Sequence, residues 1–201
     1  MIERLVLASS SPRRQALLEQ LGLRAEIAVP DIDESRLQHE TPGRYARRMA
    51  LSKAKAVDAR LAGQAAILIA ADTVVAVDDD VLGKPRDGED AQRMLHRLSG
   101  REHSVFSAVA VGPVGGAIAC KLAETRVWMR PTSRAEREAY WATEEPQGKA
   151  GGYAIQGIGA VFVERIEGNF ATVVGLPVVE MLTLLAAHGV IVPSPLNEEG
   201  T

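Results

Sequence analysis

The chain has 201 residues, 46% of them hydrophobic, and a formal net charge of −3. This length and apolar content suffice for one sizeable core, so we expect one domain or two tightly joined lobes. The acidic balance argues against a general binder of nucleic acid or of anionic membranes, so an anionic substrate would need a local basic cluster. Cys120 is the only cysteine, which excludes an intrachain disulfide, and neither a signal peptide nor a membrane span is expected. We therefore expect a soluble protein of the cytoplasm.

The start of the chain joins a predicted strand (4–8) to a predicted helix (11–21) through three consecutive serines. The last of them, Ser11, is a residue type that favours the helix N-cap. Pro12 then suits the first helical position, where the N–H that proline lacks would have had no partner. A helix N-terminus also offers free N–H groups and the positive end of the helix dipole. The segment is therefore suited to hold an anionic group.

Two arginines, Arg13 and Arg14, follow at this helix start. Cations near a helix N-terminus are mildly unfavourable, so two in a row ask for a reason beyond helix formation. Guanidinium groups match phosphate oxygens well, so phosphate binding is one interpretation. The other is that both side chains lie on a solvated helix face, and the local pattern favours neither.

The rest of the chain alternates between strand-like and helix-like patterns. The order, with a hairpin in the middle, predicts an α/β fold with a mixed sheet. We expect a single domain over 1–192 and a loose polar tail over 193–201. The predicted elements are a strand at 24–29, an acidic loop at 30–35, a helix at 42–61, a strand at 67–77, a short strand ending near 83–85, a helix at 87–98, strands at 103–111 and 117–129, a helix at 133–143, an irregular glycine-rich segment at 148–159, a strand at 161–166, a turn at 167–169 and a helix at 177–188.

Asp72 interrupts the apolar run ILIAADTVVAV, which otherwise reads as a strand buried on both faces. An unpaired carboxylate there would be costly, so Asp72 needs a cation, a metal or a proton. The alternative is that it lies at a bulge and caps a neighbouring backbone. We favour the functional interpretation, because buried carboxylates of this kind gather at active sites.

Helix geometry separates two lysines on the predicted helix 42–61. Because successive residues turn by about 100°, Lys53 falls beside the apolar stripe whereas Lys55 points nearly opposite to it. Lys53 is able to lean toward a cleft or to lay its stem over apolar surface, and the geometry alone slightly favours the second. A third lysine, Lys84, lies between Gly83 and Pro85 at a sharp turn, where most lysines serve only solubility.

The acidic loop contains Asp31, Asp33 and Glu34. Together with Asp72 these carboxylates suit Mg²⁺ or Mn²⁺, which favour oxygen ligands. An ordinary acidic surface loop is the commoner outcome for such a run. The glycine-rich segment carries one notable polar group, Gln156, which is within reach of a base edge if this segment lines a pocket.

Several common catalytic and binding motifs are missing. The four histidines show no zinc spacing with one another or with the cysteine. No GxSxG elbow surrounds the serines, and neither a P-loop nor the dinucleotide pattern GxGxxG opens a helix after a strand.

Taken together, these segments resemble the Maf family of nucleoside triphosphate pyrophosphatases. The motifs LASSSPRRQALLEQLG, DIDE, ALSKAKAV, AADTVV, LGKP, HSVFSAVAV and GKAGGYAIQGIGAVFVERIEGNFATVVGLPV occur in the order of that family and cover nearly the whole chain. The resemblance implies a fold like that of the inosine triphosphatases, with an elongated, twisted mixed sheet, flanking helices and two lobes around a cleft. It also implies a cytoplasmic enzyme and suggests a homodimer.

The implied activity is hydrolysis of a nucleoside triphosphate between its α and β phosphates. The combination of SPRR, ADT and the YAIQG loop is similar to the branch of the family that acts on dTTP and UTP. The resemblance associates Arg13, Thr73 and Gln156 with that substrate choice, and Ser9 and Arg14 with substrate binding. It assigns catalysis to Asp72, Lys53, Lys84 and Glu34, with Glu34 and Asp72 holding Mg²⁺ or Mn²⁺ and Asp72 taking the proton of the attacking water.

Two alternatives remain open. One is a house-cleaning pyrophosphatase for inosine triphosphate or 7-methyl-GTP. The other is a non-catalytic regulator, because the family is linked to inhibition of septum formation in cell division. A pure binding protein has no need of a buried acid beside cations, so Asp72 with Lys53 and Lys84 favours an enzyme.

Overall fold

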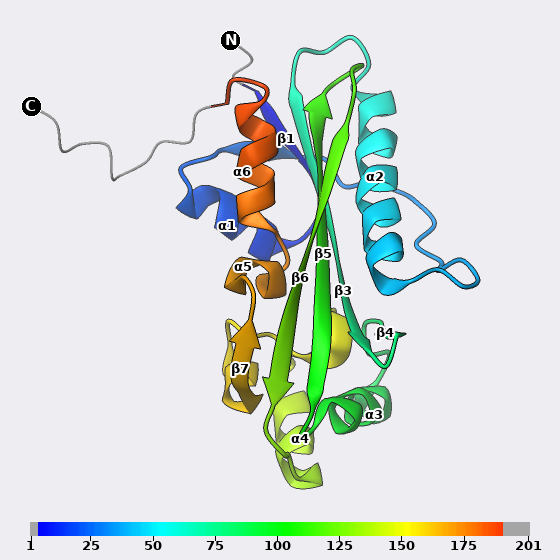
Figure 1. Cartoon of the computed structure of the whole chain (residues 1–201), viewed down its shortest axis with the longest axis vertical. Coiled ribbons are helices and arrows are strands. Elements are labelled where there is room, and N and C mark those ends of the chain that lie inside the picture. The colour runs from blue at the N-terminus through cyan, green and yellow to red at the C-terminus, as the bar shows by residue number, and fades with distance from the viewer. Residues whose placement is uncertain (1–3, 191–201) are drawn as a thin grey trace, which may run out of the picture.

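The computed structural model describes residues 4–190 and shows an elongated α/β fold built on one seven-stranded sheet (Figure 1). The strands run in the order β2-β1-β3-β5-β6-β7, with β4 beside β3. The strands are β1 (Leu5–Ala8), β2 (Ala25–Ile27), β3 (Ile67–Val77), β4 (Asp80–Leu82), β5 (Glu102–Pro113), β6 (Ala119–Met129) and β7 (Val163–Glu167), and the helices are α1 (Pro12–Gln20), α2 (Pro42–Arg60), α3 (Gly88–Leu98), α4 (Arg134–Trp141), α5 (Phe170–Val174) and α6 (Val178–Ala186), with 3-10 turns η1 (Ala150–Gly152) and η2 (Ile158–Phe162).

The sheet is mixed, as the sequence predicts. Strands β1, β2 and β3 are parallel, whereas β3, β5, β6 and β7 pair in antiparallel fashion. Ten residue pairs join β3 to β5 and ten join β5 to β6, so these three long strands form the continuous centre of the sheet.

Side chains of β3 alternate between two cores in its first half. Ile67 and Ile69 pack with α1 and α6 on one face, and Leu68 and Ala70 pack against α2 on the other. The face of α2 that meets the sheet is lined by small residues, Ala46, Ala50 and Ala54, which allow close approach. The run is therefore apolar on both faces because both faces are covered.

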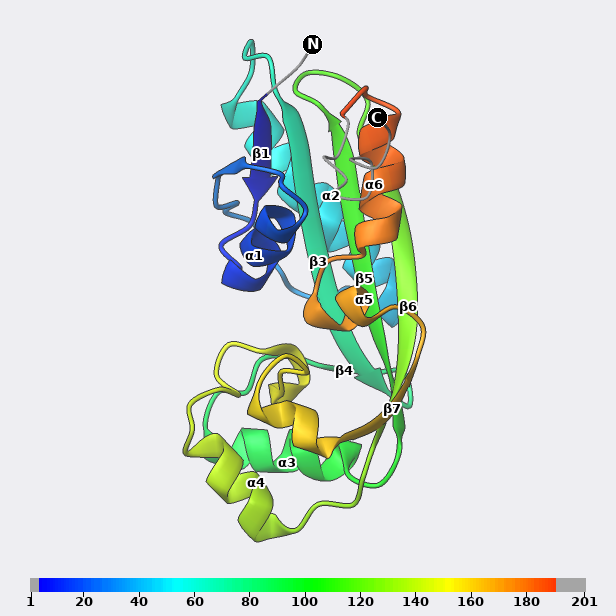
Figure 2. The ribbon, with the colours of Figure 1, turned by 90° about the vertical axis from the view of Figure 1, so that its left-hand side faces the viewer.

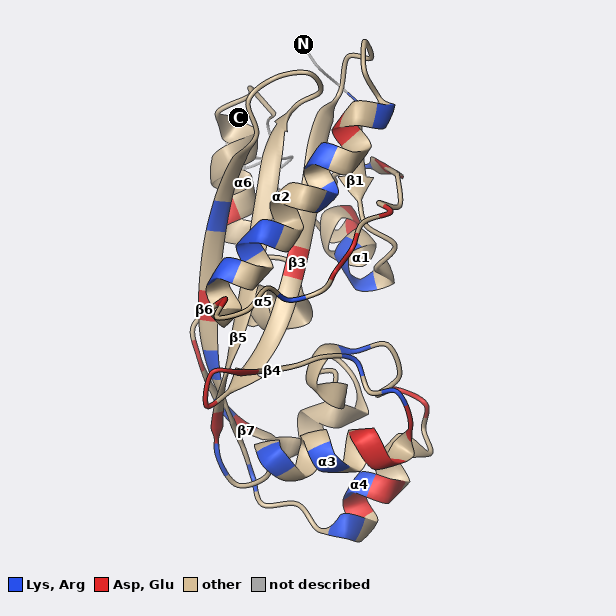
Figure 3. Cartoon of the chain, turned by 90° about the vertical axis from the view of Figure 1, so that its right-hand side faces the viewer, with Lys and Arg blue, Asp and Glu red and all other residues tan. Residues whose placement is uncertain are grey.

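The second half of β3 enters a different core. Val75 and Val77 pack with Leu95 and Leu98 of α3 and with residues of β5, β6 and the glycine-rich segment. Figures 2 and 3 show the result: one lobe contains α1, α2 and α6, the other contains α3, α4 and the 3-10 turns, and the long strands run through both. The expected two-lobed α/β architecture is confirmed.

Several elements differ from the expectation. The predicted strand at 161–166 begins two residues later, because 158–162 form η2. The predicted turn at 167–169 leads into α5, which the sequence pattern misses; its Asn169 accepts a hydrogen bond from Ala171 N–H and caps the helix. Ser11 lies at the N-cap of α1, but its side chain makes no capping bond. The polar tail at 193–201 lies outside the described residues.

Within residues 4–190, no helix is long and apolar enough to span a bilayer.

A buried histidine makes stability sensitive to acid. His103 of β5 is 2% exposed, its Nε2 lies 2.7 Å from the Tyr153 hydroxyl, and burial lowers its pKa from 6.5 to about 4. As pH falls below 6.5, the histidine of the unfolded chain gains a proton that the folded one does not, so stability falls. We expect a loss of about 2 kcal/mol between pH 7 and pH 5 from this residue, measured by urea unfolding.

The control for this prediction is His96→Gln, which changes an exposed histidine on α3 and should keep the wild-type pH dependence. His103→Gln should flatten the pH dependence of the free energy of unfolding, whatever effect the substitution has on stability at pH 7. An unchanged slope in His103→Gln would contradict the assignment.

Candidate active site

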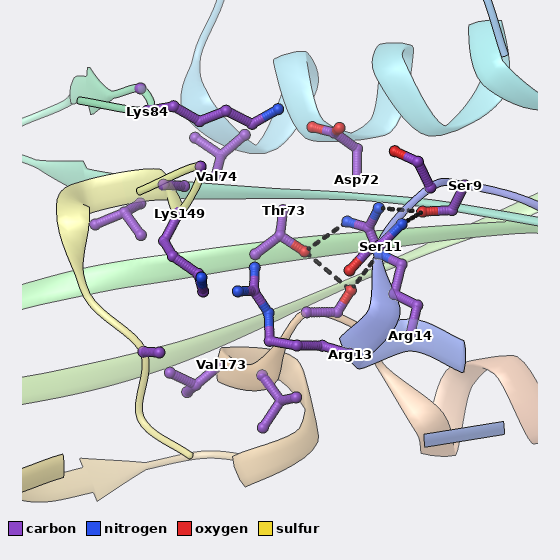
Figure 4. A pocket seen from close by; sticks show the side chains of 18 of the residues that line it. Ser9, Ser11, Arg13, Arg14, Asp72, Thr73, Val74, Lys84, Lys149 and Val173 are labelled. Carbon is purple, nitrogen blue, oxygen red and sulfur yellow. Dashed lines mark hydrogen bonds between the residues drawn. The ribbon is translucent and has the colours of Figure 1, made fainter. Parts of the chain in front are cut away.

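A cavity of about 630 Å³ lies between the two lobes. Its walls come from the β1–α1 loop, α2, β3, the segment after β4, the glycine-rich segment and α5 (Figure 4). The charged residues that line it are five cations and two carboxylates: Arg13, Arg14, Lys53, Lys84, Lys149, Glu34 and Asp72. A chain with an overall charge of −3 therefore concentrates positive charge in one place.

Lys53 joins the two carboxylates of the cavity. Its Nζ donates to Asp72 Oδ1 at 2.6 Å and lies 2.8 Å from Glu34 Oε1. Lys53 is 8% exposed, whereas Lys55 is exposed, so the helix-phase argument for these two lysines is confirmed. The stem of Lys53 lies toward the sheet, and its ammonium reaches the cavity rather than the solvent.

Asp72 lies at the centre of β3 with no bulge, paired with Ala108 of β5. It is 9% exposed. Burial raises the pKa of its carboxyl, and the positive charges of Lys53 and Arg14 oppose that rise. A buried carboxylate with a raised pKa and a hydrogen-bonded cation is the environment of a general base.

Glu34 reaches the cavity from the acidic loop. Burial acts to raise its pKa, but Lys53 and the charges of Lys84 and Arg14 outweigh burial and lower it, so this carboxyl stays ionised. Tyr45, on α2, holds the backbone here, because its hydroxyl donates to the Glu34 carbonyl at 2.6 Å. Helix spacing was the available signal for Tyr45, which lies two turns before Lys53.

The other acids of the loop do not join this centre. Asp33 Oδ1 accepts a hydrogen bond from Ser35 N–H at 2.8 Å, a local turn that holds it outside the cavity. Asp31 is exposed and is also absent from the lining. Asp31 and Asp33 therefore show the commoner outcome for such a run, an ordinary acidic surface loop, and of the three acids only Glu34 lies with Asp72 in the cavity. Within the described residues, no group of three or more His, Cys, Asp or Glu side chains is placed to hold a metal.

Arg14 is held by three hydrogen bonds. It donates to the Gly175 carbonyl at 2.8 Å, to Ser9 Oγ at 3.1 Å and to Thr73 Oγ1 at 3.2 Å. A guanidinium has five N–H groups, so two remain for a ligand. The half-buried Arg14 is therefore rigid, and burial lowers its pKa.

Thr73 belongs to the same network. The Thr73 hydroxyl donates to the Gly175 carbonyl at 3.1 Å and lies 2.7 Å from Ser107 Oγ, which itself donates to the Thr172 carbonyl. The Thr73 oxygen also accepts a hydrogen bond from Arg14. Thr73 lines the cavity, but these bonds link its hydroxyl to β5 and to the guanidinium of Arg14.

Three further expected residues line the cavity from different elements. Arg13 and Lys84 point into it in Figure 4, and Gln156 lies exposed on the glycine-rich segment. Together with Ser9, every expected site residue is thus brought to one cavity by elements from both lobes.

Lys149 also lines this cavity and was missed by the sequence analysis. Its neighbours are glycines and alanine, so no periodic pattern marks the direction of its side chain. The available signal in the sequence was the pair Gly148–Lys149, which repeats the Gly–Lys pattern of Gly83–Lys84.

The chain is similar to several known proteins. The chain is 47% identical to the dTTP/UTP pyrophosphatase of Vibrio cholerae over 184 residues, 92% of this chain and 97% of that one. It is 47% identical to the dTTP/UTP pyrophosphatase of Desulfotalea psychrophila, with 93% and 95% covered. A solved dITP/XTP pyrophosphatase of Mycobacterium abscessus has a TM-score of 0.44 at 17% identity, over 96% of this chain and 98% of that one, which is too distant to support an argument. The model of Maf-like proteins matches residues 4–188, and the chain therefore belongs to the Maf family.

Proposed function

We propose that this protein is a nucleoside triphosphate pyrophosphatase that converts dTTP and UTP to the monophosphate and pyrophosphate. The observation that carries the proposal is the cavity itself, in which five cations surround two carboxylates. A triphosphate carries the opposite charge, and a buried acid beside it supplies a base. The names of the two relatives above, both dTTP/UTP pyrophosphatases, support the choice of nucleotide.

In the proposed reaction Asp72 accepts a proton from water as the water oxygen attacks the α phosphorus. The new P–O bond forms as the bond from that phosphorus to the bridging β oxygen breaks, and pyrophosphate leaves with the bonding electrons. Lys53, Lys84 and the free N–H groups of Arg14 stabilise the charge that develops on the phosphates. Ser9 and the uncapped N-terminus of α1 add hydrogen bonds.

We propose that Arg13, Thr73 and Gln156 recognise the nucleobase of the substrate. Gln156, an exposed residue of the cavity lining, offers both donor and acceptor groups. The Thr73 hydroxyl contributes through the position of Arg14, to which it is bonded. A base that leaves such groups unpaired is strongly disfavoured.

A divalent cation, Mg²⁺ or Mn²⁺, is proposed as cofactor. Glu34 and Asp72 approach the same ammonium of Lys53, so two carboxylate oxygens are available in one place. Mg²⁺ is commonly held by one or two carboxylates together with substrate phosphates and water, and this donor set fits that pattern. When bound, the cation would neutralise charge on the phosphates.

We expect the activity to require the metal. Treatment with EDTA should abolish pyrophosphate release, and adding Mg²⁺ or Mn²⁺ in excess should restore it, because two carboxylates alone hold Mg²⁺ weakly. Glu34→Gln should raise the metal concentration that gives half-maximal rate, whereas Asp33→Asn, on the same loop but outside the cavity, should leave it unchanged. Full turnover in the chelated enzyme would refute the metal proposal.

The proposed function is tested by a panel of nucleotides with purified protein. Pyrophosphate release should be fastest with dTTP and UTP, and slow with inosine triphosphate and 7-methyl-GTP. Faster release from either purine nucleotide would replace the proposed substrate. Absence of release from every nucleotide would reject the enzyme and favour a regulator that binds.

We also propose that the enzyme is a cytoplasmic homodimer that binds neither nucleic acid nor membrane. Family resemblance supports the dimer, and the single cysteine fits a reducing compartment. Light scattering of the full chain should give twice the 21.5 kDa mass of one chain.

A further inference from the structure

The cations of the cavity form two separate groups. The charges that shift the pKa of Asp72 and Glu34 come from Lys53, Lys84 and Arg14. Those that act on Lys149 come from Arg13 and Glu145. Figure 4 shows the ends of Arg13 and Lys149 on the opposite side of Thr73 from Asp72, so these two cations occupy another part of the same cavity.

Arg13 and Lys149 face each other, and neither is held in an ion pair with a carboxylate. In Figure 4 the ends of both side chains point into the cavity and toward one another. Among residues 4–190, neither takes part in an ion pair, whereas Lys53 has two. Burial lowers the pKa of both groups, and the charge of Arg13 lowers that of Lys149 further. Two facing cations, neither of them in an ion pair, indicate a ligand with oxygen acceptors between them.

Lys149 is held firmly enough to select a ligand. Gly151 N–H donates to the Gly83 carbonyl at 3.0 Å, which ties the glycine-rich segment to the strand end that carries Lys84. Gly151 has φ +70°, and a Cβ there would lie 2.9 Å from Val75 Cγ1, so only glycine allows this approach to β3. Lys149 Nζ donates once, to the Gln147 carbonyl at 3.2 Å, and keeps two N–H groups for a ligand.

The surroundings favour a base over a phosphate at this position. The segment that carries Lys149 also carries Gln156, and it adds Tyr153, Ala154 and Ile155 to the lining. Apolar side chains from the facing walls, Val74 and Val173, complete a surface suited to a flat ring. In the proposed function the phosphates are bound by the cations around the carboxylates, which are Lys53, Lys84 and Arg14.

We propose that Lys149, together with Arg13, is a specificity-determining residue that donates hydrogen bonds to the carbonyl oxygens of uracil or thymine. This proposal rests on the proposed pyrophosphatase activity. Both bases carry an oxygen acceptor at position 4, where cytosine carries an amino donor. A cationic donor aimed at that position therefore favours UTP and dTTP and disfavours CTP.

The test compares kcat and KM for UTP and CTP in wild type, Lys149→Ala and Lys149→Arg, with Lys121→Ala, an exposed lysine on β6, as matched control. Lys149→Ala should lower kcat/KM for UTP about tenfold or more, through KM, and change CTP little, because one charge-assisted bond is lost. Lys149→Arg should retain most of the preference, and Lys121→Ala all of it.

Inhibition by pyrophosphate separates a base contact from a phosphate contact. If Lys149 contacts the base, Lys149→Ala is inhibited by pyrophosphate as wild type is. Equal losses with UTP and CTP together with weaker inhibition by pyrophosphate would overturn the proposal, as would unchanged kinetics in a variant with the wild-type melting temperature. Failure of wild type to hydrolyse UTP would instead reject the pyrophosphatase function itself.

Discussion

Asp72→Asn should lower kcat for dTTP and UTP by about 10³-fold, since general-base catalysis contributes roughly 10² to 10⁴ and a proposed metal ligand is lost as well. The change keeps the shape of the side chain and an oxygen that accepts from Lys53, which donates to Asp72 at 2.6 Å. Nucleotide should still bind, because the substitution removes a negative charge from a cavity that receives phosphates. Turnover is measured as pyrophosphate release, and binding by calorimetry with a non-hydrolysable α,β-methylene nucleotide.

The wild-type rate should also report the ionisation of Asp72. A base acts in its deprotonated form, so activity falls as pH drops through its pKa. Burial raises that pKa above 3.8, so the acid limb of the kcat profile should lie above the range of an ordinary aspartate.

Asp80→Asn is the matched control, because Asp80 is an exposed acid of β4 outside the cavity, paired with Arg97. It should leave kcat unchanged. Near-normal turnover in Asp72→Asn would show that Asp72 is not the base. Loss of binding in parallel with turnover would make it a binding residue instead.

The ion pair at the centre of the site, between Lys53 and Asp72, could be predicted from local patterns. The apolar run around Asp72 indicates a strand covered on both faces, and the burial of its neighbours agrees. The phase of α2 separates Lys53 from Lys55. Because a helix and a strand each have a fixed period, the sequence is enough to give the side of the element on which each charge lies.

Contacts between distant segments could not be predicted in this way. The bond from Arg14 to the Gly175 carbonyl joins residues 161 positions apart, through a helix, α5, of only five residues. The segment FATVV reads equally well as a strand, so periodicity cannot identify it. The position of Lys149 depends on a glycine that folds its segment against β3, which is a tertiary contact that no local pattern encodes.

Substitution of Lys53 should have the second large effect. Lys53→Met keeps the buried stem but removes the charge that Asp72 and Glu34 share. We expect kcat to fall by about 10²-fold or more, because one preorganised donor to the phosphates is lost. The matched control is Lys55→Met on the exposed face of the same helix, which should retain wild-type turnover.

The pH profile distinguishes a direct role of Lys53 from a general loss of structure. In wild type the positive charge of Lys53 lowers the pKa of Asp72, in opposition to burial. Without that charge, burial and the nearby Glu34 both raise the pKa of Asp72, so the acid limb of kcat should move to higher pH. A variant that is merely misfolded would lose melting temperature and amplitude with no such displacement. Equal effects of Lys53→Met and Lys55→Met, or an unmoved acid limb, would therefore show that Lys53 has no direct role in turnover. The ion pair between Lys53 and Asp72 would then not support the proposed chemistry of Asp72.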